Sequence, residues 1–351
     1  MNPSYAETSW ERALADVRAY VERHEGIRIT ETGLSVPQEV RAAFYDKVST
    51  VQDALVTLAL RDSAKRTAHL SELCAASRDA LIAGSDLVEF RLPRAIENAI
   101  ENPRRALAAP AFTFVLDALR QNDDEAIAQE AACAVASHAK TLDRCMYELW
   151  AYYGVVAALR PVRFYEVFSP DTVQARAMPT GVVAVGEQAS SPSKRMPEAV
   201  FETADGRVFA MKTEVARELD FYGAKIKRRR DMSLGGDSMD HMMHRVLLLY
   251  RIQSVDDVPL IADRDHMKVL ASDLMLEALL PEDMGPGLSA AMFLERLDTV
   301  RSKRPIQVLT ETSQGAFPDE VMADPRAALF ERKIIGEDSD ALADIASLLS
   351  A

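Results

Sequence analysis

An acid and a lysine on one short segment are the residues of this chain whose types and spacing best suit catalysis. Glu198 opens the segment from 196 to 215, MPEAVFETADGRVFAMKTEV, and Lys212 stands near its far end. Two apolar runs in this segment flank the turn residues Ala204-Asp205-Gly206, a pattern that predicts a β-hairpin. We therefore expect the carboxylate and the ammonium group to lie on neighbouring strands.

The same two residues fit a second interpretation that needs no catalysis. In it, Glu198 and Lys212 are solvent-facing residues at the ends of an ordinary hairpin. They then form a cross-strand charge pair that stabilises the fold by less than about 1 kcal/mol. Both interpretations stay open on the sequence alone.

A second group of polar residues lies between positions 237 and 244. His241 and His244 are three residues apart and share a helix face, with Asp237 and Asp240 nearby, so together they suit a transition metal. The first histidine is not followed by the glutamate that HExxH metalloproteases require. A capped helix with two surface histidines explains the same residues, and we favour that interpretation.

A basic run beside the hairpin is the clearest candidate for contacts with nucleic-acid phosphates. Its five cations lie within six residues and are Lys225, Lys227, Arg228, Arg229 and Arg230. The alternative is a solvated helix end, where cations complement the helix dipole. The sequence contains no GxGxxG, GxxxxGK[ST] or GxSxG motif, so it gives no support to dinucleotide, P-loop or hydrolase-elbow functions.

Composition sets limits on the class of protein. The 351 residues are enough for two domains, and the formal net charge of −13 argues against a protein that coats nucleic acid without specificity. Three cysteines without CxxC spacing favour neither a disulfide framework nor a zinc ribbon and suit a reducing compartment. No apolar run approaches the roughly 20 residues that cross a bilayer. We expect a soluble, cytoplasmic protein that does not interact with membranes.

The first part of the chain has the pattern of a helical domain. Apolar residues recur at helical spacing over 8–24, from 37 to 58 and over 63–83. Prolines then punctuate shorter helices between 92 and 120, and a nearly uninterrupted helical pattern runs from 127 to 158. We expect residues 1–140 to form an all-helical domain.

The hydrophobic period changes at Arg160 and indicates strands. Residues 161–168 alternate in polarity and are rich in β-branched and aromatic side chains. The hairpin adds two strands, and short strands fit 181–185 and 305–310. These elements predict that residues 141–351 form an α/β domain with a small mixed sheet.

Helices are expected between and after these strands. The patterns fit helices over 214–226, 239–249, 264–280 and 287–301, and a capped amphipathic helix over 339–349. The whole chain is therefore expected to be α+β and predominantly helical.

The order of these elements resembles the core of the restriction-endonuclease-like PD-(D/E)xK superfamily. The matching elements are helix 142–158, strand 161–168, hairpin 197–215, a helix and strand 305–310. In that superfamily an acid at the start of the hairpin, a second acid two residues before a lysine, and often a glutamate of the preceding helix gather one or two divalent cations. The resemblance covers under half the chain.

The resemblance implies a role for individual residues. Glu198, after Pro197, stands at the first acid, Lys212 at the lysine, and Glu148 at the helix acid. Position 210 is alanine where the family has its second acid. Glu214 lies two residues beyond Lys212, on the same face of a strand, and substitutes for that acid if the ligand set has migrated.

These assignments imply a magnesium-dependent hydrolase. Glu198, Lys212 and Glu214 would be catalytic, and Glu148 and Glu198 would bind Mg²⁺, which prefers hard oxygen ligands, stabilises charge on a phosphate and lowers the pKa of an attacking water. The implied function is a divergent nuclease that acts on or binds DNA, in defence against mobile elements. The alternative is a non-catalytic helical adaptor or scaffold subunit that docks on protein partners in a larger complex.

Overall fold

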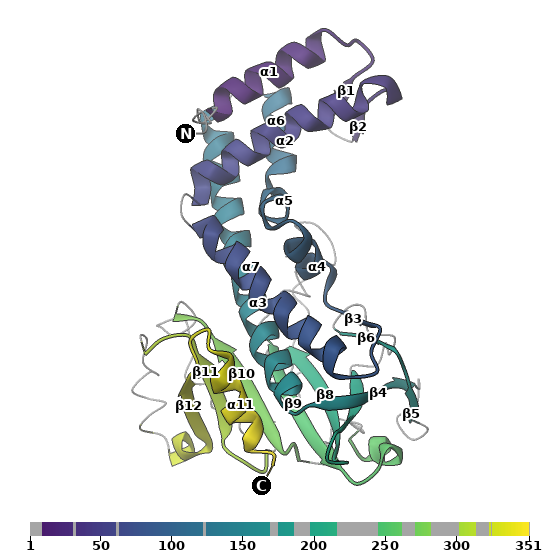
Figure 1. The fold of residues 1–351 in the computed structure, drawn as a ribbon. Coiled ribbons are helices and arrows are strands. Elements are labelled where there is room, and N and C mark those ends of the chain that lie inside the picture. The colour runs from purple at the N-terminus through teal and green to yellow at the C-terminus, as the bar shows by residue number, and fades with distance from the viewer. Residues whose placement is uncertain are drawn as a thin grey trace, which may run out of the picture. The chain divides into compact units, whose positions relative to one another are not determined.

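The computed structural model has the expected α+β class, with a helical N-terminal region followed by a mixed sheet and further helices (Figure 1). The structure describes residues 9–30, 33–60, 63–121, 124–168, 175–185, 197–215, 245–261, 271–281, 302–313, 323 and 325–350. The chain forms two compact units. The first contains residues 1–71 and 98–143, and the second contains residues 72–97 and 144–351.

The first unit is built from helices around an apolar core. Its elements are α1 (Trp10–Glu22), α2 (Gln38–Leu60), α5 (Pro103–Ala108), α6 (Ala111–Arg120) and the first parts of α3 (Ser63–Gly84) and α7 (Asp124–Ala158). Leu14, Val17 and Phe44, which the helical spacing placed on apolar faces, are at most 1% exposed. The unit also contains a short antiparallel pair that we did not predict, β1 (Arg28–Thr30) and β2 (Gly33–Ser35).

One arginine ties together three helices of the first unit. Arg18 of α1 donates to both carboxylate oxygens of Asp124, the first residue of α7, and to the carbonyls of Ala118 and Gln121 at the end of α6. A carboxylate at the start of a helix is also favoured by the helix dipole. Arg18 therefore satisfies helix-end carbonyls of α6 while it neutralises Asp124.

The second unit is organised by an eight-stranded sheet, larger than the small sheet we expected. The strand order is β12-β11-β10-β9-β8-β7-β4-β5, with β10, β11 and β12 parallel and the other neighbours antiparallel. The bounds are β4 (Pro161–Phe168), β5 (Arg176–Pro179), β7 (Ala199–Thr203), β8 (Val208–Val215), β9 (Arg245–Ile252), β10 (Leu274–Leu279), β11 (Ile306–Thr310) and β12 (Phe330–Ile334). The expected strands at 161–168 and 305–310 and the expected hairpin are confirmed.

Two predicted helices of this unit are wrong where the structure describes them. Residues 245–252, which overlap the second half of the helix expected over 239–249, form β9, and residues 274–279, within the helix expected over 264–280, form β10. Residues 246–250 and 274–279 are buried on both faces and are apolar apart from Glu277, and such a run has no period that separates a strand from a helix. The helix expected over 214–226 begins instead as the end of β8. Its remainder and the helix expected over 287–301 lie outside the described residues.

The segment from 72 to 97 belongs with the second unit. Its short strand β3 (Glu89–Arg91) pairs in parallel with β6 (Val182–Ala184), a strand we predicted, and the helix α4 (Arg94–Glu101) follows it. Phe90 packs edge-on against Tyr153 of α7 with ring centroids 4.9 Å apart. The Asp86 carboxylate accepts a hydrogen bond from the Phe164 amide at 3.0 Å. The three unit boundaries therefore fall within α3, α4 and α7, whereas we placed a single boundary near residue 140.

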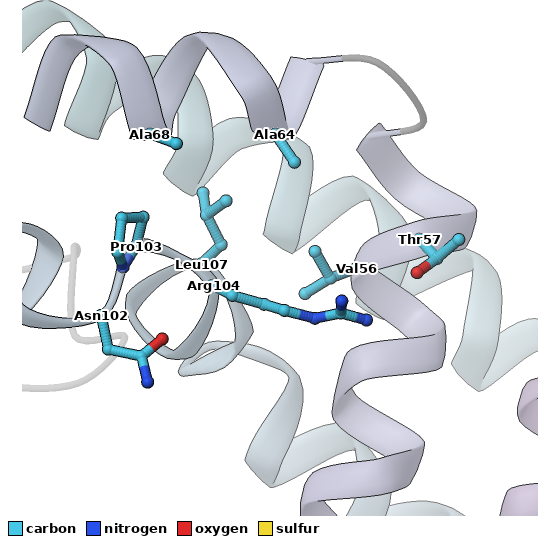
Figure 2. A pocket seen from close by; sticks show the side chains of 8 residues that line it. All are labelled: Val56, Thr57, Ala64, Ala68, Asn102, Pro103, Arg104 and Leu107. Carbon is cyan, nitrogen blue, oxygen red and sulfur yellow. The ribbon is translucent and has the colours of Figure 1, made fainter. Parts of the chain in front are cut away.

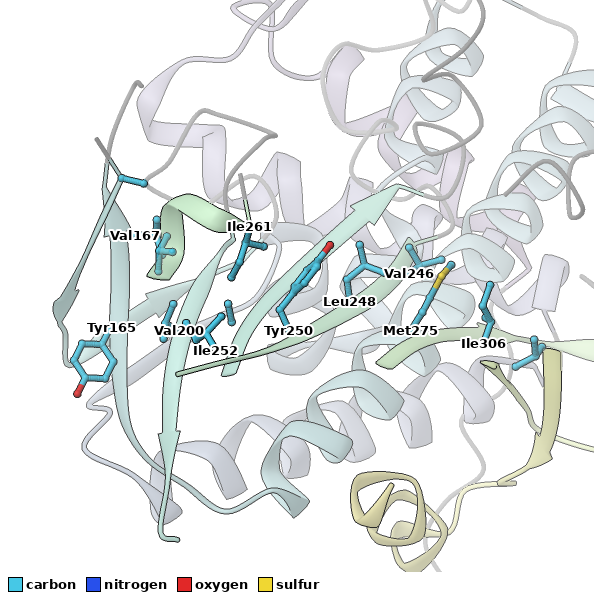
Figure 3. Packing of buried hydrophobic residues seen from close by; sticks show 14 of the residues in the cluster. Tyr165, Val167, Val200, Val246, Leu248, Tyr250, Ile252, Ile261, Met275 and Ile306 are labelled. Carbon is cyan, nitrogen blue, oxygen red and sulfur yellow. The ribbon is translucent and has the colours of Figure 1, made fainter. Parts of the chain in front are cut away.

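The sheet has two apolar faces, which we name after a residue on each. The Leu248 face carries Val200, Ala210, Leu248 and Val308 in one buried cluster, part of which Figure 3 shows. The Phe201 face carries a row of three rings from neighbouring strands, Phe164, Phe201 and Phe209, with centroids 5.7 and 5.5 Å apart. Both faces being apolar, a charged residue on either face of a central strand is buried.

The last helix, α11 (Ser339–Ser347), confirms the predicted C-terminal helix and packs closely on α7. A Cβ atom added at Gly154 of α7 would lie 2.4 Å from Cδ1 of Leu342, which is 2% exposed. The backbone of α7 thus approaches α11 more closely than a larger residue allows. None of the helices in the described part of the chain has the length and apolar character needed to pass through a bilayer.

We expect Arg18→Ala to lower the free energy of unfolding of the first unit by about 1–2 kcal/mol, because it removes charge-assisted hydrogen bonds to α6 and α7. The measurement is a urea unfolding curve of the full chain. Arg12→Ala, at an exposed position of the same helix, is the matched control and should change stability by less than about 0.5 kcal/mol. Equal effects of the two variants would contradict the role of Arg18.

We expect Gly154→Ala to destabilise the chain relative to Gly84→Ala by about 1–3 kcal/mol, the cost of overpacking a buried contact. Both changes replace a helical glycine and gain similar helix propensity. At Gly84 the nearest atom to an added Cβ, the Pro161 carbonyl oxygen, is 3.9 Å away. Thermal unfolding of both variants tests this expectation, and equal melting temperatures would show that Leu342 moves aside without cost.

Candidate catalytic site at one end of the sheet

The predicted hairpin forms and sets Glu198 beside Lys212. The amide of Glu198 donates to the Met211 carbonyl at 2.9 Å, and Ala199 pairs with Met211, so Glu198 is the cross-strand neighbour of Lys212. The turn is closed by Gly206, whose φ of 80° suits glycine. Hydrogen bonds from the side chains of Arg207 and Thr203 lower the pKa of Asp205 and keep the turn acid charged.

Lys212 is buried, which excludes the interpretation of the pair as two solvent-facing residues. Its exposed fraction is 2%, because β8 lies in the interior of the sheet with β7 on one side and β9 on the other. Glu198, at the start of β7, is partly exposed. A buried ammonium group is costly unless charged or polar groups compensate it, so Lys212 needs partners within the unit.

A second buried acid, Glu277 of β10, stands on the same face as Lys212. Lys212 pairs with Leu248 of β9, and Leu248 pairs with Met275 of β10. Val246, the next residue of β9 on this face, pairs with Glu277 of β10, so Glu277 lies in the row of paired residues next to that of Lys212. Glu277 is 1% exposed. Sequence analysis missed it because we expected a helix there, although one acid inside the apolar run LMLEALL was a visible signal.

Glu214 continues β8 beyond Lys212. It pairs with Val246, the same residue that Glu277 pairs with from the other side. The structure describes the backbone of β8 at Glu214 and not its side chain. Its proposed role as a substitute acid therefore stays a prediction.

The helix acid Glu148 lies at the same end of the sheet. Within α7, the Tyr152 hydroxyl accepts a hydrogen bond from the Ala278 amide at 3.0 Å, next to Glu277. The Tyr147 hydroxyl donates to the Gly336 carbonyl at 3.2 Å, just beyond the end of β12. Glu148 lies between these two tyrosines and is 1% exposed.

Ala210, where the PD-(D/E)xK family has an acid, is part of the apolar cluster. It is fully buried and pairs with Val200 on one side and Tyr250 on the other, both of which point into the cluster in Figure 3. An acid at this position would be surrounded by hydrocarbon and an aromatic ring. The sheet has thus filled the place of the missing carboxylate with apolar packing.

The carboxylates at this end have the donor type that Mg²⁺ prefers. Mg²⁺ keeps several waters and is commonly bound through one or two carboxylates together with substrate phosphates, so Glu198 and Glu148 suit it by chemistry. Among the residues whose side chains the structure describes, no three or more His, Cys, Asp or Glu come together as a metal site. The described part therefore contains no three-ligand set of the kind that zinc requires.

Two predicted groups cannot be placed. The basic run Lys225, Lys227, Arg228, Arg229 and Arg230 lies outside the described residues. The same is true of the group from Asp237 to His244.

A pocket in the first unit is separate from the predicted residues. It has a volume of about 360 Å³ (Figure 2). Its lining is formed by Val56, Thr57, Ala64, Ala68, Asn102, Pro103, Arg104 and Leu107. The one ionisable lining residue, Arg104, is bound to Asp53 at 3.2 Å, so the pocket offers no arrangement that suits the predicted chemistry.

No known protein guides the interpretation of this site. No family model, no curated protein and no solved structure matches the chain. The resemblance to the PD-(D/E)xK superfamily therefore rests on the residues and the order of the elements alone.

We expect Tyr152→Phe to lower the free energy of unfolding by about 1–3 kcal/mol, because it leaves the buried amide of Ala278 without its acceptor. Urea unfolding measures the change. Tyr45→Phe, at a ring that is 42% exposed, is the control and should change stability by less than about 0.5 kcal/mol. An unchanged Tyr152→Phe variant would mean that water replaces the hydroxyl.

Proposed function

We propose that the second unit is a divergent nuclease-like module that binds the phosphodiester backbone of DNA at the end of the sheet where Glu198 and Lys212 are neighbours. The observation that carries the proposal is the burial of Lys212 directly across from an acid, with Glu148 and Glu277 at the same end. A buried ionisable side chain beside a residue of opposite charge is common at functional sites. Structural ion pairs give the same signal, so the proposal needs a test by activity.

Lys212 is the group that suits a phosphate in this proposal. Its ammonium acts on charge that develops on a phosphate oxygen, and that attraction is stronger in a buried site than in water. Glu198, which is partly exposed, is the cross-strand neighbour of Lys212 on β7. Glu198 and Glu148 are the residues that would hold Mg²⁺, and the ion would supply charge neutralisation of the phosphate and a more acidic bound water.

A version of this function without cleavage has an observation in its favour. Position 210 carries an alanine packed against Val200 and Tyr250 in place of the second acid. A module of this kind keeps the fold and the lysine and binds DNA without cutting it. Its binding would weaken as salt rises, because phosphate contacts release counterions.

The test is incubation of the full chain with linear and circular DNA in the presence of Mg²⁺ or Mn²⁺. We expect cleavage, and we expect Lys212→Ala to reduce its rate by about 100-fold or more through loss of an electrostatic contact in the transition state. Lys303→Ala is the matched control. Lys303 lies just before β11, at the end of the sheet opposite to Lys212. Its side chain is 48% exposed and pairs with Asp273 at 2.9 Å. Its loss should therefore leave the rate unchanged.

The outcomes separate the two versions. Cleavage that depends on Lys212 supports catalysis, whereas equal cleavage by wild type and Lys212→Ala contradicts it. Salt-sensitive DNA binding without cleavage, weakened by Lys212→Ala and not by Lys303→Ala, supports the binding version. A wild-type chain that neither binds nor cuts DNA contradicts both.

A further inference from the structure

We propose that Glu277 is the counter-charge of Lys212 and that it positions the ammonium group at the end of the sheet. The pairing is inferred from the sheet itself. Its consequence for activity rests on the proposed function. Glu277 is thus a positioning residue, which acts through Lys212 and not on a substrate.

The register places the two residues within reach of each other. Lys212 and Glu277 lie on the Leu248 face of β8 and β10, the two strands that flank β9. They stand in neighbouring rows of paired residues. Neighbouring strands lie about 4.8 Å apart, and residues on one face recur about every 6.8 Å along a strand. An extended lysine side chain and an extended glutamate side chain together cover that diagonal.

Each of the two residues needs a charge of the opposite sign. Lys212 is 2% exposed and Glu277 is 1% exposed. The residues between them on that face, Val246 and Leu248, are apolar and fully buried, and they offer no polar side-chain atom. Removing one partner of a buried pair leaves the other charge uncompensated, which is strongly destabilising.

Lys212 is the cation that the described side chains of this face provide. On the Leu248 face from β7 to β11, the described side chains include the acids Glu198, Glu202 and Glu277, and Lys212 is the single cation among them. Glu202 lies at the far end of the hairpin, where the Tyr165 hydroxyl donates to it at 3.2 Å. Among the described acids of these strands, Glu198 and Glu277 are therefore the candidates to pair with Lys212.

The two acids differ in their access to solvent, and this divides their roles. Glu277 is 1% exposed in a central strand of the sheet, whereas Glu198, at the start of β7, is partly exposed. The enclosed acid fixes the ammonium from the inside of the sheet. Glu198 is the one of the two acids that lies nearer to solvent.

A double-mutant cycle in unfolding tests the pairing without any assay of function. Glu277→Gln, Lys212→Met and the double variant are compared with wild type by urea unfolding. We expect each single change to destabilise the chain, and the double variant to unfold with an equilibrium constant at least about tenfold smaller than additivity predicts. Additive effects would overturn the pairing.

A second cycle controls for general effects on the sheet. Glu331→Gln on β12 replaces an acid that accepts hydrogen bonds from Lys333 and Gln307. Combined with Lys212→Met, it should be additive, because Glu331 lies on the opposite face. If a single variant does not fold, recovery of folding in the double variant shows the coupling, and a double variant that also fails to fold overturns the pairing.

Activity separates positioning from mere stability. For the cleavage proposed above, Glu277→Gln should lower kcat by about 10–100-fold with little change in KM, and Glu277→Asp should recover part of the loss. In the Lys212→Ala background, Glu277→Gln should lower kcat no further. If cleavage depends on Lys212 but the stability cycle is additive, the pairing with Glu277 fails and the proposed function stands. If the cycle is coupled but the chain does not cleave DNA, the pairing stands and catalysis fails.

Discussion

The register of strand β9 is the constraint on which the rest of the second unit depends. β9 is buried on both faces, and its pairing with β8 on one side and β10 on the other brings distant segments into fixed rows. A shift of one residue would turn Leu247 and Leu249 onto the face that Leu248 now occupies, and every other side chain of β9 would change face as well. The register therefore fixes which charged side chains share a face.

Within that frame, charge is tolerated only where it is compensated. Lys212 and Glu277 stand in rows that are otherwise filled by Val246, Leu248 and Met275. The buried charged pair stabilises the fold less than apolar residues at the same two positions would. Two charged residues in the interior fix a specific arrangement of charge, and this is the physical basis for assigning them a function.

The sequence predicted those elements whose patterns carry a period or a turn signal. Helices α2 and α7, strand β4 and the hairpin around Gly206 were found in this way, and with them the neighbourhood of Glu198 and Lys212. β9 and β10 were taken for helices because a strand buried on both faces has no alternation to read. The burial of Lys212 and the role of Glu277 then could not be predicted, since both follow from the pairing of strands that are far apart in sequence.

The path of the chain through its two units limits how the protein can be divided, both in evolution and by truncation. The chain enters the second unit at residue 72, returns to the first at 98 and leaves it again after 143, with α3, α4 and α7 running across these three points. A break at any one of the three leaves at least one unit incomplete, because each unit is made of two separate stretches of the chain, and Phe90 and Asp86 pack with residues beyond 143. Gene fusion or fission at one point would not yield two self-sufficient modules. The helical part and the sheet are therefore bound to evolve as one covalent unit, with neither free to be exchanged alone.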